Sequence, residues 1–445
     1  MLQAQVAELT ARLNQNSGNS SKPPSADPPD VRASRPKPPP SGRKRGGQPG
    51  HKGLTRCSFP PDQVDEVQDC VPDCCVGCGT CLPQTAGADD PAPQVHQVAD
   101  LPPKLKLYVR EFRLHARRCP NCGQRNWASL PAGVPRGNWG SGVHALAALL
   151  VGSFRLSRRP AHEFFTALFG AAPCLGTLVA LEAATVEALR SAVAEAVAAV
   201  QQAEAVNSDE TGWRKARDRL TLWVVVAGKL AVFRIGRRDG AMFEKLPPPG
   251  TARVVISDRY AVYERVGAAS RQCCWAHLKR NFQAVVDLGS PTGLTVGNWA
   301  LAETRKLFHR WHCFQRGEID REELQAQLEP VQGAFRTLLA LGSAGPCQKT
   351  ARLCGELEEW WAALWTFATR EGVEPTNNAA ERALRSAVLW RKSSFGHQSE
   401  GGREFVETML TVCGSLRLQG RPALPFVRAA CEARLTGITG PSLLS

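Results

Sequence analysis

The feature that most constrains the fold is a change of hydrophobic period at residue 205. Residues 131–204 are rich in Ala and Leu at helical spacing, whereas the following segment carries short β-branched and apolar runs. Leu222–Ala227 and Leu230–Ile235, joined by Gly228-Lys229, predict a hairpin. Helical segments then alternate with strands in the order β, β-β, α, β, α, β, α. This alternation predicts an α/β core over residues 205–288 in an otherwise helical chain.

Length and charge narrow the possible functions. The 445 residues allow two to four domains, and the net charge of +14 favours a polyanionic partner, nucleic acid before a membrane surface. A basic but unspecialised surface is the alternative. No apolar run approaches the roughly 18 residues of a membrane span, and the N-terminus has no signal peptide. We expect a cytoplasmic, nucleoid-associated protein with no membrane partner.

The N-terminal region has a low-complexity, basic character. Leu2, Val6, Leu9 and Leu13 have heptad spacing, which predicts a short coiled-coil-like helix over residues 1–16; an isolated amphipathic turn is the alternative. Residues 17–56 are rich in Ser, Pro, Gly and Asn, and their second half is basic without any acid, which predicts a disordered linker. The linker is either a solvated spacer or a phosphate-contacting segment. Its DNA-binding candidates are Arg43, Lys44, Arg45 and Lys52.

Cysteine clustering predicts a zinc-finger-like region over residues 57–130. Eight of the 16 cysteines lie between Cys57 and Cys122, and in a reducing compartment such clustering favours zinc over disulfides. Two Cys-x-x-Cys-Gly knuckles place pairs of thiolates on tight turns, and alternation over residues 94–114 predicts a hairpin between them. The predicted ligands are Cys75, Cys78, Cys119 and Cys122. Cys70, Cys74 and Cys81 are competing ligands, and unmetallated cysteines are the alternative.

Three further regions are predicted to be helical. Residues 131–204 are helical and compatible with a helix-turn-helix-like DNA module or with a plain helical spacer. Residues 289–372 predict a helical insertion with its own small core. Its five tryptophans pack in that core or stack on bases. Residues 403–445 predict two amphipathic C-terminal helices.

Two predicted strands end in an acid. Asp209 and Asp258 each follow a hydrophobic strand, and side chains at adjacent strand ends converge on one rim of a sheet. Glu381, near the start of a later helix, supplies a third acid. Three carboxylates in one cleft repel one another unless cations are present, and such ligands suit magnesium or manganese. A two-metal site of this kind activates a water or a 3′-hydroxyl for phosphodiester displacement.

Glu381 also has two local interpretations. Asn378 and Glu381 have capping-box spacing, and Glu381 and Arg385 have ion-pair spacing. The two strand-end aspartates favour the metal-ligand interpretation, with an Asn378 cap fixing the helix start. Glu210 adjoins Asp209, but strand alternation lets only one of the two face the metals.

Several segments together resemble the bacterial insertion-sequence transposases of family sixty-six. The linker segments 19–25 and 46–53 resemble that family's linker signatures, and the double Cys-x-x-Cys matches its zinc-finger region. The remaining motifs are Asn207–Trp213, Ile256–Tyr263, Cys274–Arg280 and Pro375–Arg385.

The resemblance implies a ribonuclease H-like catalytic core over residues 205–288 and 373–402, within a multidomain α+β protein. It implies an Asp-Asp-Glu triad at Asp209, Asp258 and Glu381, and it favours Asp209 over Glu210. It also implies metal-dependent transposition, with terminal inverted repeats as substrate and small accessory proteins as partners. We further expect a homo-oligomer on DNA.

Basic residues around the predicted site are candidate DNA contacts. His277 is placed to contact the scissile phosphate or to organise the metal cleft; a packed helix-start histidine is the alternative. Arg382, Arg385 and Lys392 lie on or after the Glu381 helix, where they contact the DNA backbone or form a solvated basic face.

Three functions are compatible with these features. The first is a transposase that nicks element ends and joins the 3′-hydroxyl to target DNA. The second is a catalytically inactive, zinc-containing DNA-binding protein derived from one. The third is a different metal nuclease on the same fold. The presence of all three acids favours the first.

Overall fold

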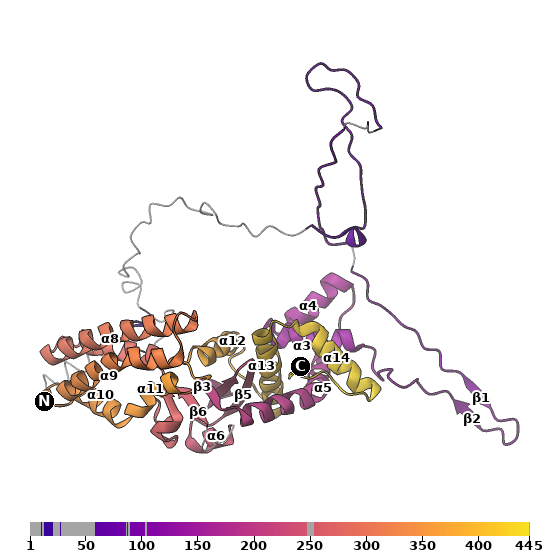
Figure 1. Cartoon of the computed structure of the whole chain (residues 1–445). Coiled ribbons are helices and arrows are strands. Elements are labelled where there is room, and N and C mark those ends of the chain that lie inside the picture. The colour runs from indigo at the N-terminus through magenta and orange to yellow at the C-terminus, as the bar shows by residue number, and fades with distance from the viewer. Residues whose placement is uncertain are drawn as a thin grey trace. The chain divides into compact units, whose positions relative to one another are not determined.

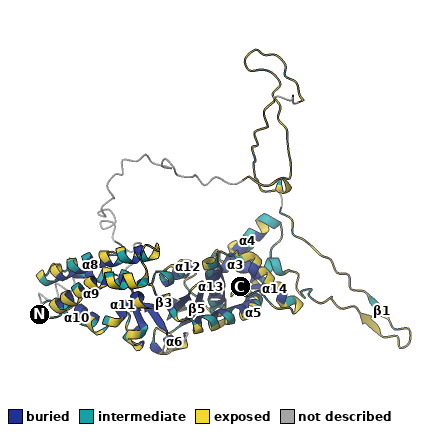
Figure 2. Ribbon diagram, in the orientation of Figure 1, coloured by how far each residue is buried: buried dark blue, intermediate teal, exposed yellow. Residues whose placement is uncertain are grey.

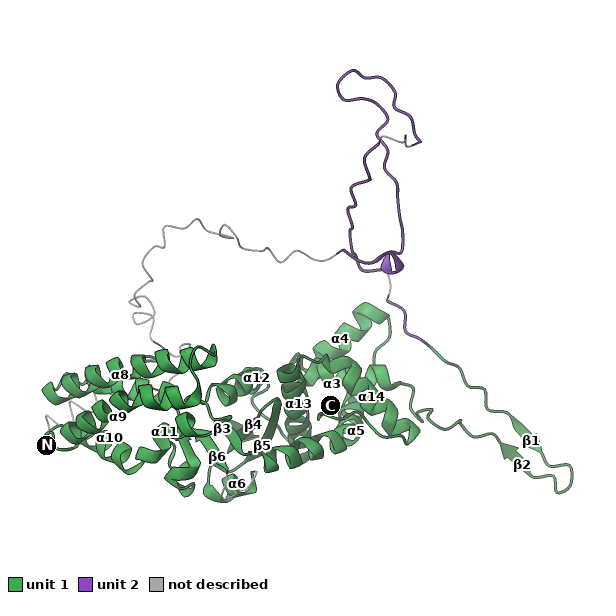
Figure 3. Cartoon of the chain, viewed as in Figure 1, with its two compact units in different colours: residues 1–34, 109–445 green, residues 35–108 purple. Residues whose placement is uncertain are grey.

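The computed structural model describes residues 10, 13–20, 27, 58–85, 87, 90–102, 105–246 and 253–444. The chain divides into two compact units, one of residues 1–34 and 109–445 and one of residues 35–108 (Figure 3). Most of the predicted N-terminal helix and basic linker lies outside the described residues, so those two predictions remain open. No described helix combines the length and apolar character that crossing a membrane requires.

A five-stranded mixed sheet forms the centre of the larger unit. Its strands run in the order β5-β4-β3-β6-β7. The first three are antiparallel neighbours, whereas β3, β6 and β7 pair in parallel. The structure confirms the predicted hairpin and strands. Their apolar, β-branched runs form strands because such side chains are buried best in a sheet that is covered on both faces. The bounds are β3 Ala205–Lys215, β4 Asp218–Ala227, β5 Leu230–Gly236, β6 Val254–Ser257 and β7 Arg271–Cys273.

Short helical segments connect the later strands, as the alternation predicts. The segment after Tyr260 forms two 3₁₀ turns, η3 and η4, rather than an α-helix. The connecting elements are α6 Gly240–Lys245, η3 Ala261–Arg265, η4 Ala268–Ser270 and α7 Trp275–Asp287. A much later segment, α12 (Asn378–Ser394), returns to pack on β3 and β4.

The helices before and after the sheet share one hydrophobic core with it. Buried side chains of α3, α5, α13 and α14 join those of β3, β4 and β5 in a single cluster. Figure 1 shows these helices around the sheet, and in Figure 2 their buried residues face it. The region at 131–204 is therefore part of the sheet's packing. The bounds are α3 Ser141–Gly152, α4 Arg158–Phe169, α5 Leu175–Gln202, α13 Glu400–Gln419 and α14 Ala423–Thr436.

Helix α13 closes the free edge of the sheet at β5. Three α13 side chains at four-residue spacing, Glu407, Thr411 and Ser415, accept hydrogen bonds from the N–H groups of alternate β5 residues, at 2.8, 3.1 and 3.0 Å. Residues four apart on a helix are separated by about 6 Å along the helix axis, which is close to the length of two residues in a strand. The β5 N–H groups, which could otherwise pair with another strand, are thus hydrogen-bonded within the chain.

The predicted helical insertion consists of α8 to α11, between α7 and α12. Its core is not its own, however: the cluster that holds Trp311 and Trp365 also contains Val254 and Ile256 of β6. The insertion packs on the far side of the sheet, where its apolar side chains bury those of β6 and β7. The bounds are α8 Pro291–Gln315, α9 Arg321–Ser343, α10 Gln348–Glu359 and α11 Trp361–Thr369.

The predicted hairpin over residues 94–114 is wrong. The described residues in that range form no strand, and Val95 and Val98 are about four-fifths exposed (78% and 81%). Alternation specifies a strand only where one face can be buried, and most of the described side chains of this segment are exposed. The local strands are β1 Ala116–Arg118 and β2 Arg125–Trp127, which pair around the second cysteine knuckle; η2 spans Pro61–Gln63.

Candidate active site

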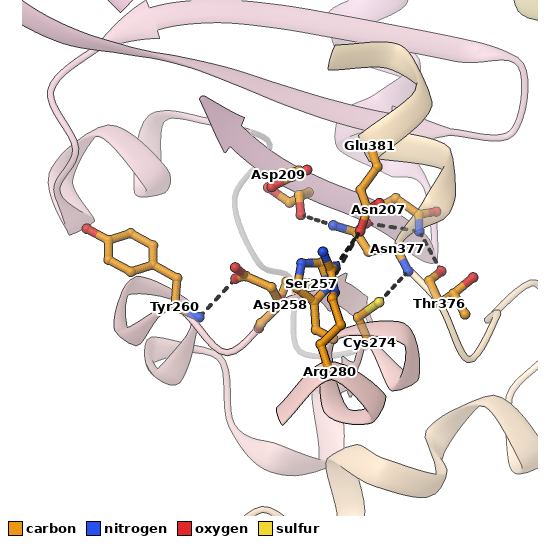
Figure 4. Close-up of polar contacts among 12 residues, drawn as sticks. Asn207, Asp209, Ser257, Asp258, Tyr260, Cys274, Arg280, Thr376, Asn377 and Glu381 are labelled. Carbon is orange, nitrogen blue, oxygen red and sulfur yellow. Dashed lines mark hydrogen bonds and ion pairs between the residues drawn. The ribbon is translucent and has the colours of Figure 1, made fainter. Parts of the chain in front are cut away.

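Asp209 and Asp258 come from neighbouring parallel strands, but only Asp258 follows the end of its strand. The prediction that the first strand ends at Asp209 is wrong, because β3 continues to Lys215, where it is still paired with β4. Strands β3 and β6 pair in parallel up to Asn207 and Ile256, and each aspartate comes two residues later. Glu381 comes from the first turn of α12, which packs on β3. Figure 4 shows the three side chains reaching one region from β3, from the loop after β6 and from α12.

The carboxylates interact electrostatically. Burial is the main cause that raises the pKa of Asp209 well above its ordinary value, and the negative charges of Glu210, Asp258 and Glu381 raise it further. One oxygen of each aspartate is fixed: Asp209 Oδ1 accepts the Glu210 N–H, and Asp258 Oδ1 accepts the Tyr260 N–H, both at 2.9 Å.

Glu210, the alternative to Asp209, is engaged elsewhere. Its side chain is 4% exposed; Oε1 accepts from Arg238 at 2.8 Å and Oε2 accepts from the Tyr263 hydroxyl at 2.7 Å. Both carboxylate oxygens therefore have protein donors. This arrangement favours Asp209 as the acid available to a cation.

The start of α12 is held by Asn377, and the Asn378 cap is wrong. Asn377 is the N-cap residue and makes no side-chain capping bond. Its amide donates instead to the Ser208 carbonyl at 2.7 Å and accepts from Asn207 at 3.2 Å. Its backbone N–H donates to Cys274 Sγ at 3.2 Å. With Asn377 at the N-cap, the third helical residue is Ala380, whose side chain cannot complete a capping box, and the Glu381 N–H bonds to the Asn377 carbonyl at 3.2 Å. The side-chain amide and the backbone N–H of Asn377 thus bond to residues distant in the sequence, which local spacing cannot reveal.

The Glu381 carboxylate faces α7 rather than Arg385. Its Oε1 lies 3.4 Å from His277 Nδ1 and 3.7 Å from Arg280 Nη2. The predicted i, i+4 ion pair with Arg385 does not form, because Arg385 projects to solvent. Arg280 is a site residue that sequence reasoning missed; its signal was the three-residue spacing from His277, which sets both on one face of α7.

His277 lies inside the site rather than on the surface. Burial, followed by the charge of Arg280, lowers the pKa of its imidazole. The ring faces Glu381, and its predicted contact with DNA remains a prediction. Of the other predicted DNA contacts, Arg382, Arg385 and Lys392 are exposed on α12, whereas Arg43, Lys44, Arg45 and Lys52 lie outside the described residues.

Each predicted zinc knuckle adopts the turn that its glycine allows. The N–H of Gly79 bonds to the Cys75 carbonyl at 2.8 Å, and the N–H of Gly123 bonds to the Cys119 carbonyl at 2.9 Å, with φ of +72° and +74°. Hydrogen bonds within the turns lower the thiol pKa of Cys78 and Cys119. The two knuckles belong to different compact units, so their joint four-sulfur site remains a prediction.

Comparison with known proteins identifies the family. Residues 137–404 match the model of the "Transposase IS66 family", and residues 1–57 match a family of unknown function, DUF6444. A relative from Sinorhizobium fredii, "Uncharacterized protein y4qI", is 25% identical over 191 residues, which cover 40% of this chain and 35% of the relative. The chain thus spans about a third of that relative's length. Because the transposase match covers more than half of the chain, including all three acids, the chain belongs to the IS66 family of transposases.

Proposed function

We propose that the protein is an Asp-Asp-Glu transposase that binds the terminal inverted repeats of a mobile element and catalyses metal-dependent DNA cleavage and strand transfer. The observation that carries this proposal is the convergence of Asp209 from β3, Asp258 from the loop after β6 and Glu381 from α12. The mixed sheet, with one acid on β3 and another just after the neighbouring strand β6, supports the ribonuclease H-like assignment of the core.

The donor set fits Mg²⁺ or Mn²⁺. All three candidate ligands are carboxylates, and hard divalent cations prefer oxygen donors. The carboxylate charges that raise the pKa of Asp209 favour a cation in the same place. When bound, a pair of such ions activates the attacking water or 3′-hydroxyl and stabilises the leaving oxygen.

The chain's own residues would prepare this site in two ways. Backbone N–H groups fix one oxygen of each aspartate, which limits the rotamers of both side chains. The Asn377 contacts hold the helix that aims Glu381. The exposed Arg382, Arg385 and Lys392 would contact DNA phosphates, which gives position rather than sequence readout.

The knuckle cysteines Cys75, Cys78, Cys119 and Cys122 are proposed to bind structural Zn²⁺. The tight turns and lowered thiol pKa values support this role, because zinc binds thiolates. The helices at 131–204 and the basic linker would bind DNA, and a homo-oligomer assembled on the repeats, with the element's accessory proteins, would carry out transposition.

The deciding experiment compares Asp209→Asn with Asp218→Asn, the same substitution at an exposed position on the neighbouring strand β4. DNA that carries the element's ends is incubated with purified protein and Mn²⁺, and nicking, joining and DNA affinity are measured. We expect Asp209→Asn to lose at least about a hundred-fold in cleavage, more than outer-shell changes remove at metal sites, while its DNA affinity stays close to that of the wild type. If the wild type binds the ends but neither nicks nor joins them, the alternative of an inactive DNA-binding protein holds instead.

A further inference from the structure

A second possible ligand set lies beside the carboxylate triad. Cys274, His277 and Glu381 each direct one ligand atom to a common point, and the three atoms lie within 4.8 Å of one another. Cys274 precedes α7 and His277 lies in its first turn, three residues later, so both face the same side of that helix. Glu381 reaches them from α12.

The two facing atoms of this cluster lack hydrogen-bond partners among the described residues. Within that part of the chain, His277 Nδ1 and Glu381 Oε1 are both buried without a hydrogen bond, although they lie 3.4 Å apart. That distance exceeds the 2.7–3.2 Å or so of a good N–H···O bond. It matches the separation of about 3.3–3.6 Å between two ligands of one tetrahedral ion with bonds of about 2.0–2.2 Å. The geometry is that of two ligands around an ion rather than of a donor and an acceptor.

The donor types select the ion. We propose that Cys274, His277 and Glu381 form a site for a thiophilic divalent ion, Zn²⁺ by preference. A sulfur, an imidazole nitrogen and a carboxylate oxygen suit zinc, whereas Mg²⁺ and Mn²⁺ are bound by oxygen sets such as that of the triad. Three protein ligands leave a fourth position open for water. The cluster is therefore distinct in chemistry from the site at Asp209 and Asp258, and the two share only Glu381.

The surroundings of Cys274 support a ligand role. Its side chain is 1% exposed, and its sulfur accepts the Asn377 N–H at 3.2 Å. Burial raises the pKa of this thiol to about 11 in the metal-free protein, and the Asn377 hydrogen bond offsets part of that rise. The same N–H orients the sulfur, as outer-shell groups do at metal centres. A small side-chain rotation brings ligand atoms within 4.8 Å onto one ion, and Glu381, which is about one-third exposed, has room to rotate.

Occupation of this site would control the catalytic site, a consequence that rests on the proposed function. Zinc bound to Glu381 Oε1 would hold that carboxylate toward α7. The oxygen set of Asp209 and Asp258 would then lose its third member. Zinc should therefore inhibit Mn²⁺-dependent cleavage.

The metal site is tested without DNA by titrating Co²⁺ into the full-length protein and recording the thiolate-to-cobalt charge-transfer absorption. Cys274→Ser is compared with Cys273→Ser, the same change at the adjacent buried cysteine, which lies outside the cluster. His277→Gln is the second test variant. We expect Cys274→Ser and His277→Gln to lower the affinity of one Co²⁺ per chain by at least about ten-fold, the lower end of what even outer-shell changes cause, and Cys273→Ser to bind as the wild type does. The knuckle cysteines contribute equally to all four proteins.

Equal cobalt stoichiometry, affinity and absorption in the wild type, Cys274→Ser and His277→Gln would overturn the proposal. In a second arm, the protein is first saturated with Zn²⁺ and then dialysed. Micromolar Zn²⁺ is afterwards added during Mn²⁺-dependent DNA cleavage. Each protein is compared with itself without added zinc: inhibition should be present in the wild type and lost in Cys274→Ser. Inhibition of equal strength in both would refute the regulatory consequence. If no protein cleaves DNA but the cobalt site is present, the proposed function fails and the metal site stands.

Discussion

Replacing Asn377 by Ala should destabilise the protein and misplace Glu381. The substitution removes the hydrogen bond to the Ser208 carbonyl at 2.7 Å and the one from Asn207 at 3.2 Å, at a side chain that is fully buried. Each bond contributes about 1 kcal/mol net, and a buried polar group left unsatisfied adds about 1–3 kcal/mol. We expect the free energy of unfolding to fall by about 3–5 kcal/mol.

Asn378→Ala is the matched control, because a cap at Asn378 would also predict a loss of about 1 kcal/mol. Asn378 is the first residue of α12 and is not its N-cap, so its replacement should change stability by less than about 0.5 kcal/mol. Urea unfolding of the two variants and the wild type measures the difference. Equal stabilities of the two variants, or a greater loss for Asn378→Ala, would refute the tertiary contacts assigned to Asn377.

Three further predictions follow from the same contacts. Burial and neighbouring charges raise the folded-state pKa of Asp209, so this group favours folding below its unfolded pKa of 3.8, and that contribution is lost as the pH rises through the folded value. Asp209→Asn should therefore raise the melting temperature of the metal-free protein at pH 7 but not at pH 3. An equal shift at both pH values would contradict this. Thr411→Val leaves the Phe233 N–H unsatisfied at the β5 edge and should cost about 1–3 kcal/mol in urea unfolding. Thr408→Val, with a side chain that is also buried on α13, should cost less. Tyr263→Phe removes the 2.7 Å bond to Glu210 and should lower the free energy of unfolding by about 1–2 kcal/mol; no change would mean that Arg238 alone satisfies Glu210.

Local patterns predicted the strands well and their partners poorly. The apolar runs at 222–227 and 230–235 predict β4 and β5 because alternating and β-branched residues fit only a buried sheet. The same logic failed at 94–114, where none of the described residues forms a strand and Val95, Val98 and Leu101 stay exposed. Periodicity reports what a segment can bury, and it does not report whether the rest of the chain supplies a surface to bury it against.

The sequence alone determined most of the strands and helices and where the cysteine turns bend, since each depends on residues only a few positions apart. Only the tertiary structure decided that Asp209 lies within β3 rather than at its end, and that the parallel pairing of β3 and β6 brings it near Asp258. It also decided that Asn377 rather than Asn378 holds α12, and that Glu381 faces His277 and Arg280 rather than Arg385. These contacts join residues about 50 to 170 positions apart, and a side chain with several local partners within reach takes the one that burial and packing bring closest.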